Sequence, residues 1–100
     1  MSRVHHMALL RFKPTATEEK VQALWTALAV LKQKLPGILY FAAGPYASPE
    51  GLNQGFTHGF LMTFVDAAAR DSYLVHPEHE RVKENFLPFV ENVVVFDFAE

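Results

Sequence analysis

The sequence predicts an α+β fold in which helical segments cover one face of a four-stranded antiparallel sheet. Four short segments carry the alternating or continuous apolar pattern of strands, and two longer ones carry apolar residues at helical spacing. Along the chain they come in the order β-α-β-β-α-β, the ferredoxin-like pattern, with the first and third strands central. One hundred residues suffice for a single domain, which we place at residues 1–100.

The first two predicted elements are a strand over residues 4–13 and the helix that follows it. His6 lies on the more apolar face of this strand. Thr15 and Glu18 have capping-box spacing, so we expect the helix to begin there, and Pro36 ends it. The stripe of this helix that faces the core consists of Val21, Leu24, Trp25, Leu28, Leu31 and Leu35.

Three further strands are predicted over residues 38–46, 56–64 and 92–98. The middle one alternates like a half-buried strand, whereas the other two are apolar on both faces. Two helical segments can cover only one face of a sheet. We therefore expect a second copy of the chain to cover the other face as a symmetric homodimer.

The second helical region is predicted as two helices, because Pro77 interrupts it. Asp66 is expected to cap the first half, and Pro77 fits the first position of a second half over residues 77–88. Helical spacing places His79 on the inward, apolar face of that half. We expect His79 and Tyr73 to approach the same cavity.

Strand directions bring four polar residues to one end of that cavity. Antiparallel neighbours place His6 and Asp97 beside Tyr73 and His79. His58 shares the sheet face but begins its strand, so strand direction places it at the far end. A neutral imidazole accepts a proton near pH 7, a tyrosine hydroxyl donates to a carbonyl or enolate, and Asp97 is expected to fix a histidine tautomer.

Simpler interpretations stay open for these residues. His79 and Tyr73 also fit an ordinary core, in which a backbone carbonyl satisfies the imidazole and the hydroxyl lies at the rim. A metal site would use His76 and His79 with Glu78 or Glu80. We predict no metal site, because His76 lies outside the helix that carries His79.

Composition excludes several classes of function. The net charge of −2 and the lack of a basic face argue against a nucleic-acid or anionic-membrane partner. The chain has no Cys, which removes thiolate chemistry and suits a cytoplasmic protein. No apolar run approaches the roughly 20 residues of a membrane span. The glycines of residues 48–55 have no phosphate-binding spacing, and we expect no cofactor.

Four stretches of the sequence resemble the stress-responsive dimeric α/β-barrel (Dabb) family. They are HHMALLRFKP, SPEGLNQGFTHGFLMTF, ARDSYLVHPEHERV and VVVFDF, and they follow in the family's order over nearly the whole chain. The resemblance implies the ferredoxin-like fold and a homodimer whose two sheets form a dimeric α+β barrel. Most members of the family have no assigned reaction, and some plant members are associated with stress.

The resemblance also implies roles for individual residues. The family includes a polyketide cyclase that closes its substrate by aldol condensation. Tyr73 and His79 match the positions of its catalytic tyrosine and histidine. His6 and His58 match the positions of its two pocket histidines. The resemblance thus brings His58 into the pocket. Where the cyclase has Phe and Tyr on its first helix, this chain has Trp25 and Leu28, so we expect a cavity of different shape.

Three functions follow as hypotheses. The first is binding of a small apolar, aromatic or polyketide-like molecule between sheet and helices; its expected contacts are His6, His58, Leu10, Trp25, Leu28 and Asp97, beside Tyr73 and His79. The second is a cofactor-independent cyclase, lyase or isomerase in which His79 removes a proton and Tyr73 holds the oxyanion. The third is a structural stress protein without a ligand.

Overall fold

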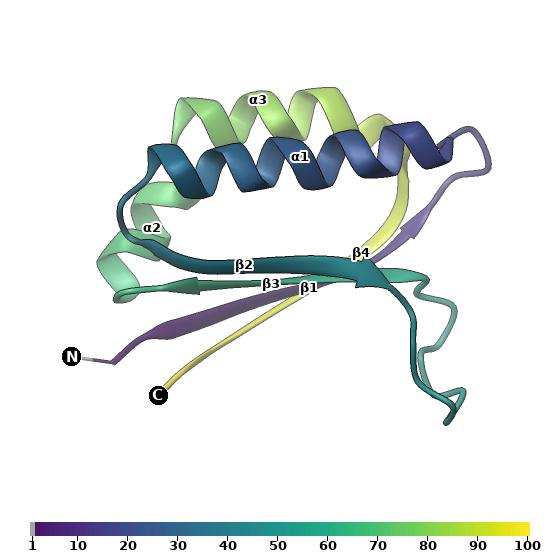
Figure 1. Ribbon diagram of the computed structural model, residues 1–100, viewed down its shortest axis with the longest axis horizontal. Helices are drawn as coiled ribbons and strands as arrows, with labels where there is room; N and C mark the ends of the chain where they lie inside the picture. Colours follow the sequence, from purple (N-terminus) through teal and green to yellow (C-terminus); the bar gives the residue numbers. More distant parts are fainter. Residues whose placement is uncertain (1) are drawn as a thin grey trace.

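The computed structural model describes residues 2–100 and consists of two layers, with all helices on one face of the sheet (Figure 1). The strand order is β2-β3-β1-β4, with every neighbouring pair antiparallel. The elements are β1 (Val4–Phe12), α1 (Glu18–Lys34), β2 (Ile38–Pro45), β3 (His58–Phe64), α2 (Ala67–Leu74), α3 (Pro77–Phe86), the 3-10 turn η1 (Leu87–Phe89) and β4 (Val90–Ala99). The predicted ferredoxin-like arrangement, with the first and third strands central, is confirmed.

Helix α1 begins later than the capping-box spacing predicts. Its N-cap is Thr17, whose Oγ1 accepts a hydrogen bond from the Lys20 backbone N–H at 3.2 Å. The Ala16 N–H donates to the Lys13 carbonyl at 2.9 Å, so the preceding residues form a turn and Thr15 lies outside the helix. The prediction that Thr15 caps this helix is therefore wrong.

Other boundaries differ by two residues from the prediction. β3 begins at His58 rather than at residue 56, because the Phe56 N–H still closes a loop turn with the Asn53 carbonyl. β4 begins at Val90, two residues early, and α3 ends at Phe86 before a short 3-10 turn. None of these shifts changes the face on which a side chain lies.

The break at Pro77 is present, and both helices beside it are capped. The Asp66 Oδ1 accepts from the Ala69 N–H at 2.8 Å, and the His76 Nδ1 accepts from the Glu78 N–H at 3.1 Å. Each cap satisfies a backbone donor that has no partner within its own helix. The turn lets α3 run beside α1 across the sheet, while α2 lies at one end of the sheet (Figure 1).

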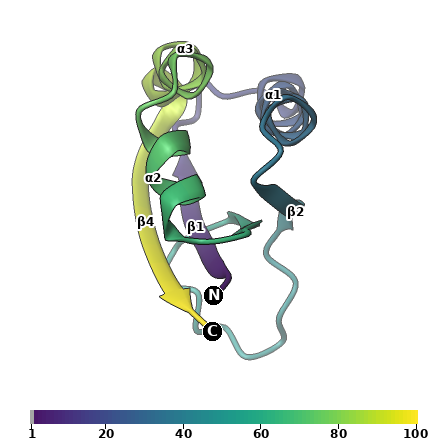
Figure 2. The same cartoon turned by 90° about the vertical axis from the view of Figure 1, so that its left-hand side faces the viewer.

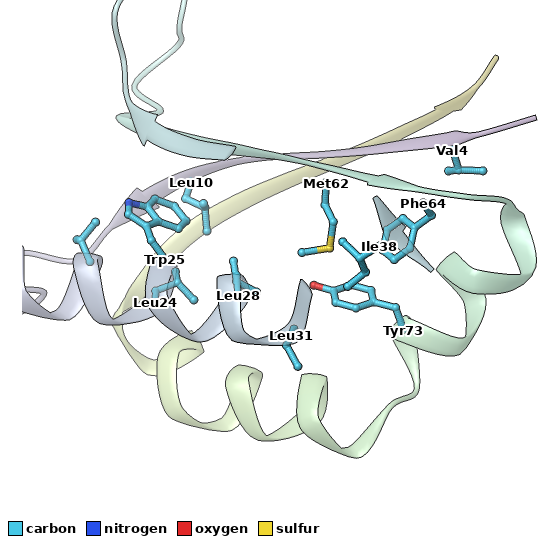
Figure 3. Packing of buried hydrophobic residues seen from close by; sticks show 11 residues of the cluster. Val4, Leu10, Leu24, Trp25, Leu28, Leu31, Ile38, Met62, Phe64 and Tyr73 are labelled. Carbon is cyan, nitrogen blue, oxygen red and sulfur yellow. The ribbon is translucent and has the colours of Figure 1, made fainter. Parts of the chain in front are cut away.

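The core lies between α1, α2 and the helix-facing side of the sheet (Figure 3). Its buried hydrophobic members are Val4, Leu10, Val21, Leu24, Trp25, Leu28, Leu31, Ile38, Met62, Phe64 and Tyr73. The predicted stripe of α1 is confirmed from Val21 to Leu31, and Leu35 is only partly buried. Burying each large apolar side chain contributes about 1.5–3 kcal/mol, so this layer supplies most of the fold's stability.

The opposite side of the sheet, called the outer face below, is apolar but has no helix over it in residues 2–100 (Figure 2). Its larger apolar side chains are Met7, Leu9, Tyr40, Leu61, Val94, Phe96 and Phe98, and the polar His5 and Thr63 share this face. Phe96 is 61 % exposed and Tyr40 is 51 % exposed. An apolar sheet face of this extent is typical of a surface that another protein covers.

Candidate functional site

A cavity of about 370 Å³ lies between the helix-facing side of β1 and β4 and the helices α1 and α3. Its wall includes the polar side chains of His6, Tyr73, His79 and Lys83. Apolar wall comes from residues such as Leu10 and Leu28, as the sequence predicts. A cavity of roughly 150 Å³ already holds benzene, so this one has room for a molecule of one or two rings.

Tyr73 is almost fully buried, at 1 % exposure, and its side chain comes from α2. Its ring packs against that of His79, with centroids 4.2 Å apart, and its hydroxyl points into the space between α1 and the sheet (Figure 3). No group among residues 2–100 hydrogen-bonds this hydroxyl. Burial raises the pKa of Tyr73, so the hydroxyl stays protonated and can donate to a ligand.

His79 lies on the first turns of α3, and its Nδ1 is 3.2 Å from the Leu74 carbonyl oxygen. A carbonyl only accepts, so Nδ1 carries the proton and Nε2 has the free lone pair in the neutral ring. Burial lowers the pKa of His79, and the charge of Lys83 lowers it further, although the bond to Leu74 opposes both. The ring is therefore neutral near pH 7 and able to accept a proton through Nε2.

His6 also contributes a polar side chain to the cavity wall, and Asp97 holds its ring by a hydrogen bond. The two residues are directly opposite in the β1–β4 register, and the His6 Nδ1 donates to the Asp97 Oδ1 at 2.7 Å. His6 is 5 % exposed, and its ring centroid is 5.9 Å from that of Tyr73. Its Nε2 has no protein partner within residues 2–100. Asp97 does not line the cavity but orients the histidine that does.

His58 and Trp25 do not line this cavity. The ring of His58 lies 5.1 Å from that of Phe12 and 6.4 Å from that of Trp25, and its Nδ1 is bonded to the Thr57 hydroxyl. The ring of Trp25 lies 6.3 Å from that of Phe60, which in turn lies 5.8 Å from that of His6 and lines the cavity. Trp25 and His58 therefore lie beyond Phe60, outside the cavity wall. Strand direction indicates this position for His58, whereas the family resemblance implies the pocket; the structure does not bring His58 to the other three residues.

The alternative metal site does not form. The His76 Nδ1 accepts from the backbone of α3, while the His79 Nδ1 faces a carbonyl. Among residues 2–100, no three His, Asp or Glu side chains come together as metal ligands would. In the same part of the chain, no helix combines the length and apolar character needed to cross a bilayer.

Two charged residues at the site are absent from the sequence-based prediction. Lys83 lies in the cavity wall, and Arg70 donates through Nη1 to the Asp97 Oδ2 at 2.9 Å. Helical spacing offered a signal for both. Lys83 follows His79 by four residues and Arg70 precedes Tyr73 by three, so each pair lies on one side of its helix.

Comparison with known proteins places this geometry in a family. The family model for the stress responsive A/B barrel domain, Dabb, matches residues 4–100. The chain is 34% identical over 95 residues to the Arabidopsis thaliana stress-response A/B barrel domain-containing protein HS1, covering 95% of this chain and 87% of that protein. It is 24% identical over 96 residues to olivetolic acid cyclase of Cannabis sativa, covering 96% and 95% respectively.

A solved structure agrees with the family match. A dimeric ferredoxin-like protein from Jannaschia sp. CCS1 superposes with a TM-score of 0.87 and 29% sequence identity, covering 96% of this chain and 97% of the other. The family match extends over β1 to β4 and includes every residue of the cavity wall. The chain therefore belongs to the stress-responsive A/B barrel domain (Dabb) family.

Proposed function

We propose that this protein binds a small, mostly apolar molecule, aromatic or polyketide-like, in the cavity between α3 and β4. The observation that carries the proposal is a cavity of about 370 Å³ with mostly apolar walls, in which His6, Tyr73 and His79 are joined by one charged residue, Lys83. Largely apolar walls with a few convergent polar groups are typical of small-molecule sites. The ligand supplies a hydrogen-bond acceptor for the Tyr73 hydroxyl and a donor for an imidazole Nε2.

The cavity argues against a purely structural role. Protein interiors pack at crystal-like density, and each sizeable void lowers stability. The Tyr73 hydroxyl supports this, because it has no hydrogen-bond partner within residues 2–100 and is free to donate into the cavity. A chain with only a structural role would be expected to fill this space with side chains.

We also propose that two copies associate through the outer face. The similar protein from Jannaschia sp. CCS1 is described as dimeric. The outer face of this chain exposes Leu9, Phe96 and Phe98 in one continuous patch on neighbouring strands. Sheet-to-sheet packing about a twofold axis would remove these side chains from water.

A second candidate function is proton transfer without a cofactor. The specific observation that favours it is the contact between the Tyr73 and His79 rings, which places a hydroxyl donor beside a neutral imidazole. His79 Nε2 would take the proton from the carbon next to a carbonyl, and the electron pair would form an enolate whose oxygen accepts from Tyr73. The similarity to a protein named olivetolic acid cyclase supports this candidate.

Binding is tested by calorimetric titration with olivetolic acid and with acetophenone as a smaller aromatic carbonyl probe. We expect saturable binding of at least one probe, weakened about tenfold in Tyr73→Phe because one hydrogen bond is lost. Tyr40→Phe is the matched control, since Tyr40 lies on the outer face, and it should bind like the unchanged protein. Equal binding by all three proteins, or by none, would contradict the proposed site.

Proton transfer is tested separately by deuterium exchange at the methyl group of acetophenone in heavy water, followed by NMR. Catalysed exchange should be present in the unchanged protein and lost in His79→Gln and Tyr73→Phe. His58→Gln is the control, because His58 does not line the cavity. Saturable binding without catalysed exchange would support the binding function and remove the enzymatic one.

A further inference from the structure

Arg70, on α2, is the residue that completes the polar network behind His6. Its Nη1 donates to the Asp97 Oδ2 at 2.9 Å, and its Nε donates to the Asp71 Oδ1 at 2.8 Å. The side chain is only 24 % exposed, so the guanidinium is partly withdrawn from water. One flat group is thus held between two carboxylates on different elements, α2 and β4.

Both oxygens of Asp97 have a protein partner. His6 Nδ1 donates to Oδ1 at 2.7 Å and Arg70 donates to Oδ2. A carboxylate bonded through one oxygen alone can turn about its last side-chain torsion, which has a broad energy well. The second bond, to a planar and permanently charged guanidinium, fixes the plane of the carboxylate. The direction of the bond to His6 is fixed with it.

The imidazole rings of His6 and His79 are therefore held in place by hydrogen bonds of different strength. The His79 Nδ1 bonds to a neutral carbonyl at 3.2 Å and lies in the first turn of α3, just after the helix interruption at Pro77, whereas the His6 Nδ1 bonds at 2.7 Å to an anchored carboxylate. Charge-assisted hydrogen bonds are shorter and roughly twice as strong as neutral ones. His6 is therefore the rigid imidazole of the pair, with Nε2 free on the opposite side of its ring.

We propose that Arg70 is a positioning residue: by holding the Asp97 carboxylate it locks His6 with Nδ1 protonated and Nε2 as a fixed acceptor for the ligand. This inference rests on the proposed function for its ligand. The lock itself does not, because it is a property of the protein alone. Arg70 touches neither the cavity nor its contents and acts through Asp97.

The lock is tested by NMR of protein labelled with ¹⁵N-histidine, without any ligand. The probe is the His6 Nδ1 proton, identified by its disappearance in His6→Gln. In the unchanged protein this proton should exchange slowly with water, because it is bonded to a fixed carboxylate. In Arg70→Leu its exchange should be roughly tenfold faster or the signal should be lost.

Arg81→Leu is the matched control. Arg81 lies on α3 and bonds to Glu78, so the variant removes the same charge without touching Asp97. Its His6 signal should not change. Equal exchange in Arg70→Leu and in the unchanged protein would overturn the proposal. So would loss of the His6 signal together with unfolding of all α2 amides, because the effect would then be structural.

Asp71→Asn keeps the test decisive if Arg70→Leu does not fold. Asp71 is 67 % exposed, so its replacement leaves the core intact while it loosens the Nε side of Arg70. We expect about threefold faster exchange of the His6 proton. No change would count against the lock. Failure of every probe to bind, with the His6 signal still dependent on Arg70, would remove the proposed function and leave the lock in place.

Discussion

The two faces of the sheet are similarly apolar in sequence, yet within residues 2–100 helices cover only one of them. Leu10 and Leu9 are neighbours on β1: Leu10 faces the helices and is 5 % exposed, whereas Leu9 is on the outer face and is 46 % exposed. The helix-facing side combines a packed core with a cavity, whereas within residues 2–100 the outer face has no helix over it and is bordered by the loop after β2. The packed core and the proposed ligand site thus lie on one face, and the proposed dimer contact lies on the other.

The largest effect is expected on the proposed dimer, from a charge introduced on the outer face. Phe96→Asp would bury an unpaired carboxylate in the proposed dimer, and twofold symmetry would repeat the change. The dimer dissociation constant should rise at least about a thousandfold, measured by light scattering after size-exclusion chromatography. Val75→Asp, which changes an exposed residue outside both faces, should stay dimeric. A dimeric Phe96→Asp would place the interface elsewhere.

The next largest effect is expected on the free energy of unfolding, from a substitution on the helix-facing side of the sheet. Leu28 is 3 % exposed and lines the cavity, so Leu28→Ala should lower the free energy of unfolding by about 2–5 kcal/mol. Urea denaturation measures this change. Leu52, on the loop after β2, is 73 % exposed, and Leu52→Ala should cost less than about 0.5 kcal/mol. Similar costs for the two variants would mean that α1 does not seal the core as described.

Lowering the pH should destabilise the folded protein through protonation of His79. Its pKa is lowered in the folded protein from the ordinary value of 6.5, so the unfolded chain binds the proton more readily. The contribution of neutral His79 to the free energy of unfolding is complete above pH 6.5 and is lost as the pH falls below that value. The urea midpoint should fall between pH 7 and pH 5 by more in the unchanged protein than in His79→Gln. An identical fall in both would show that other groups dominate this range.

The smallest effect on stability among the buried residues is expected from Tyr73→Phe. The ring fills the same space among Phe64 and His79, and the lost hydroxyl has no protein partner within residues 2–100. The free energy of unfolding should change by less than about 1 kcal/mol, because no protein hydrogen bond is broken. Urea denaturation checks this value. A loss of several kcal/mol would mean that the hydroxyl serves the fold rather than a ligand.

The fold was predictable because its signals are local. Alternation in β1, the stripe of α1 and the break at Pro77 each lie within a short window of sequence, and together they determine the order and layers of the fold. The cap of α1 was missed because Thr15 and Thr17 offer the same side-chain chemistry within two residues. Only the backbone turn before the helix distinguishes them.

The site was predictable in part. Register alone brings Asp97 opposite His6, and helix periodicity points His79 inward. The bond of Arg70 to Asp97 joins two elements through long side chains, so it depends on geometry that a pattern of residue types does not carry. A cavity is likewise set by the space left between side chains, and Trp25 turned out to fill a different part of the layer.

The pairing of β1 with β4 also affects the order in which parts of the protein fold. His6 and Asp97 are 91 residues apart, so their bond forms only when distant parts of the chain meet. Contacts of such sequence separation form late and slowly compared with local ones, such as α1 or the β2–β3 pair. Val93 and Val95 of β4 also close one side of the cavity. The cavity would therefore form later than the helices during refolding, because it is complete only when β4 has paired with β1.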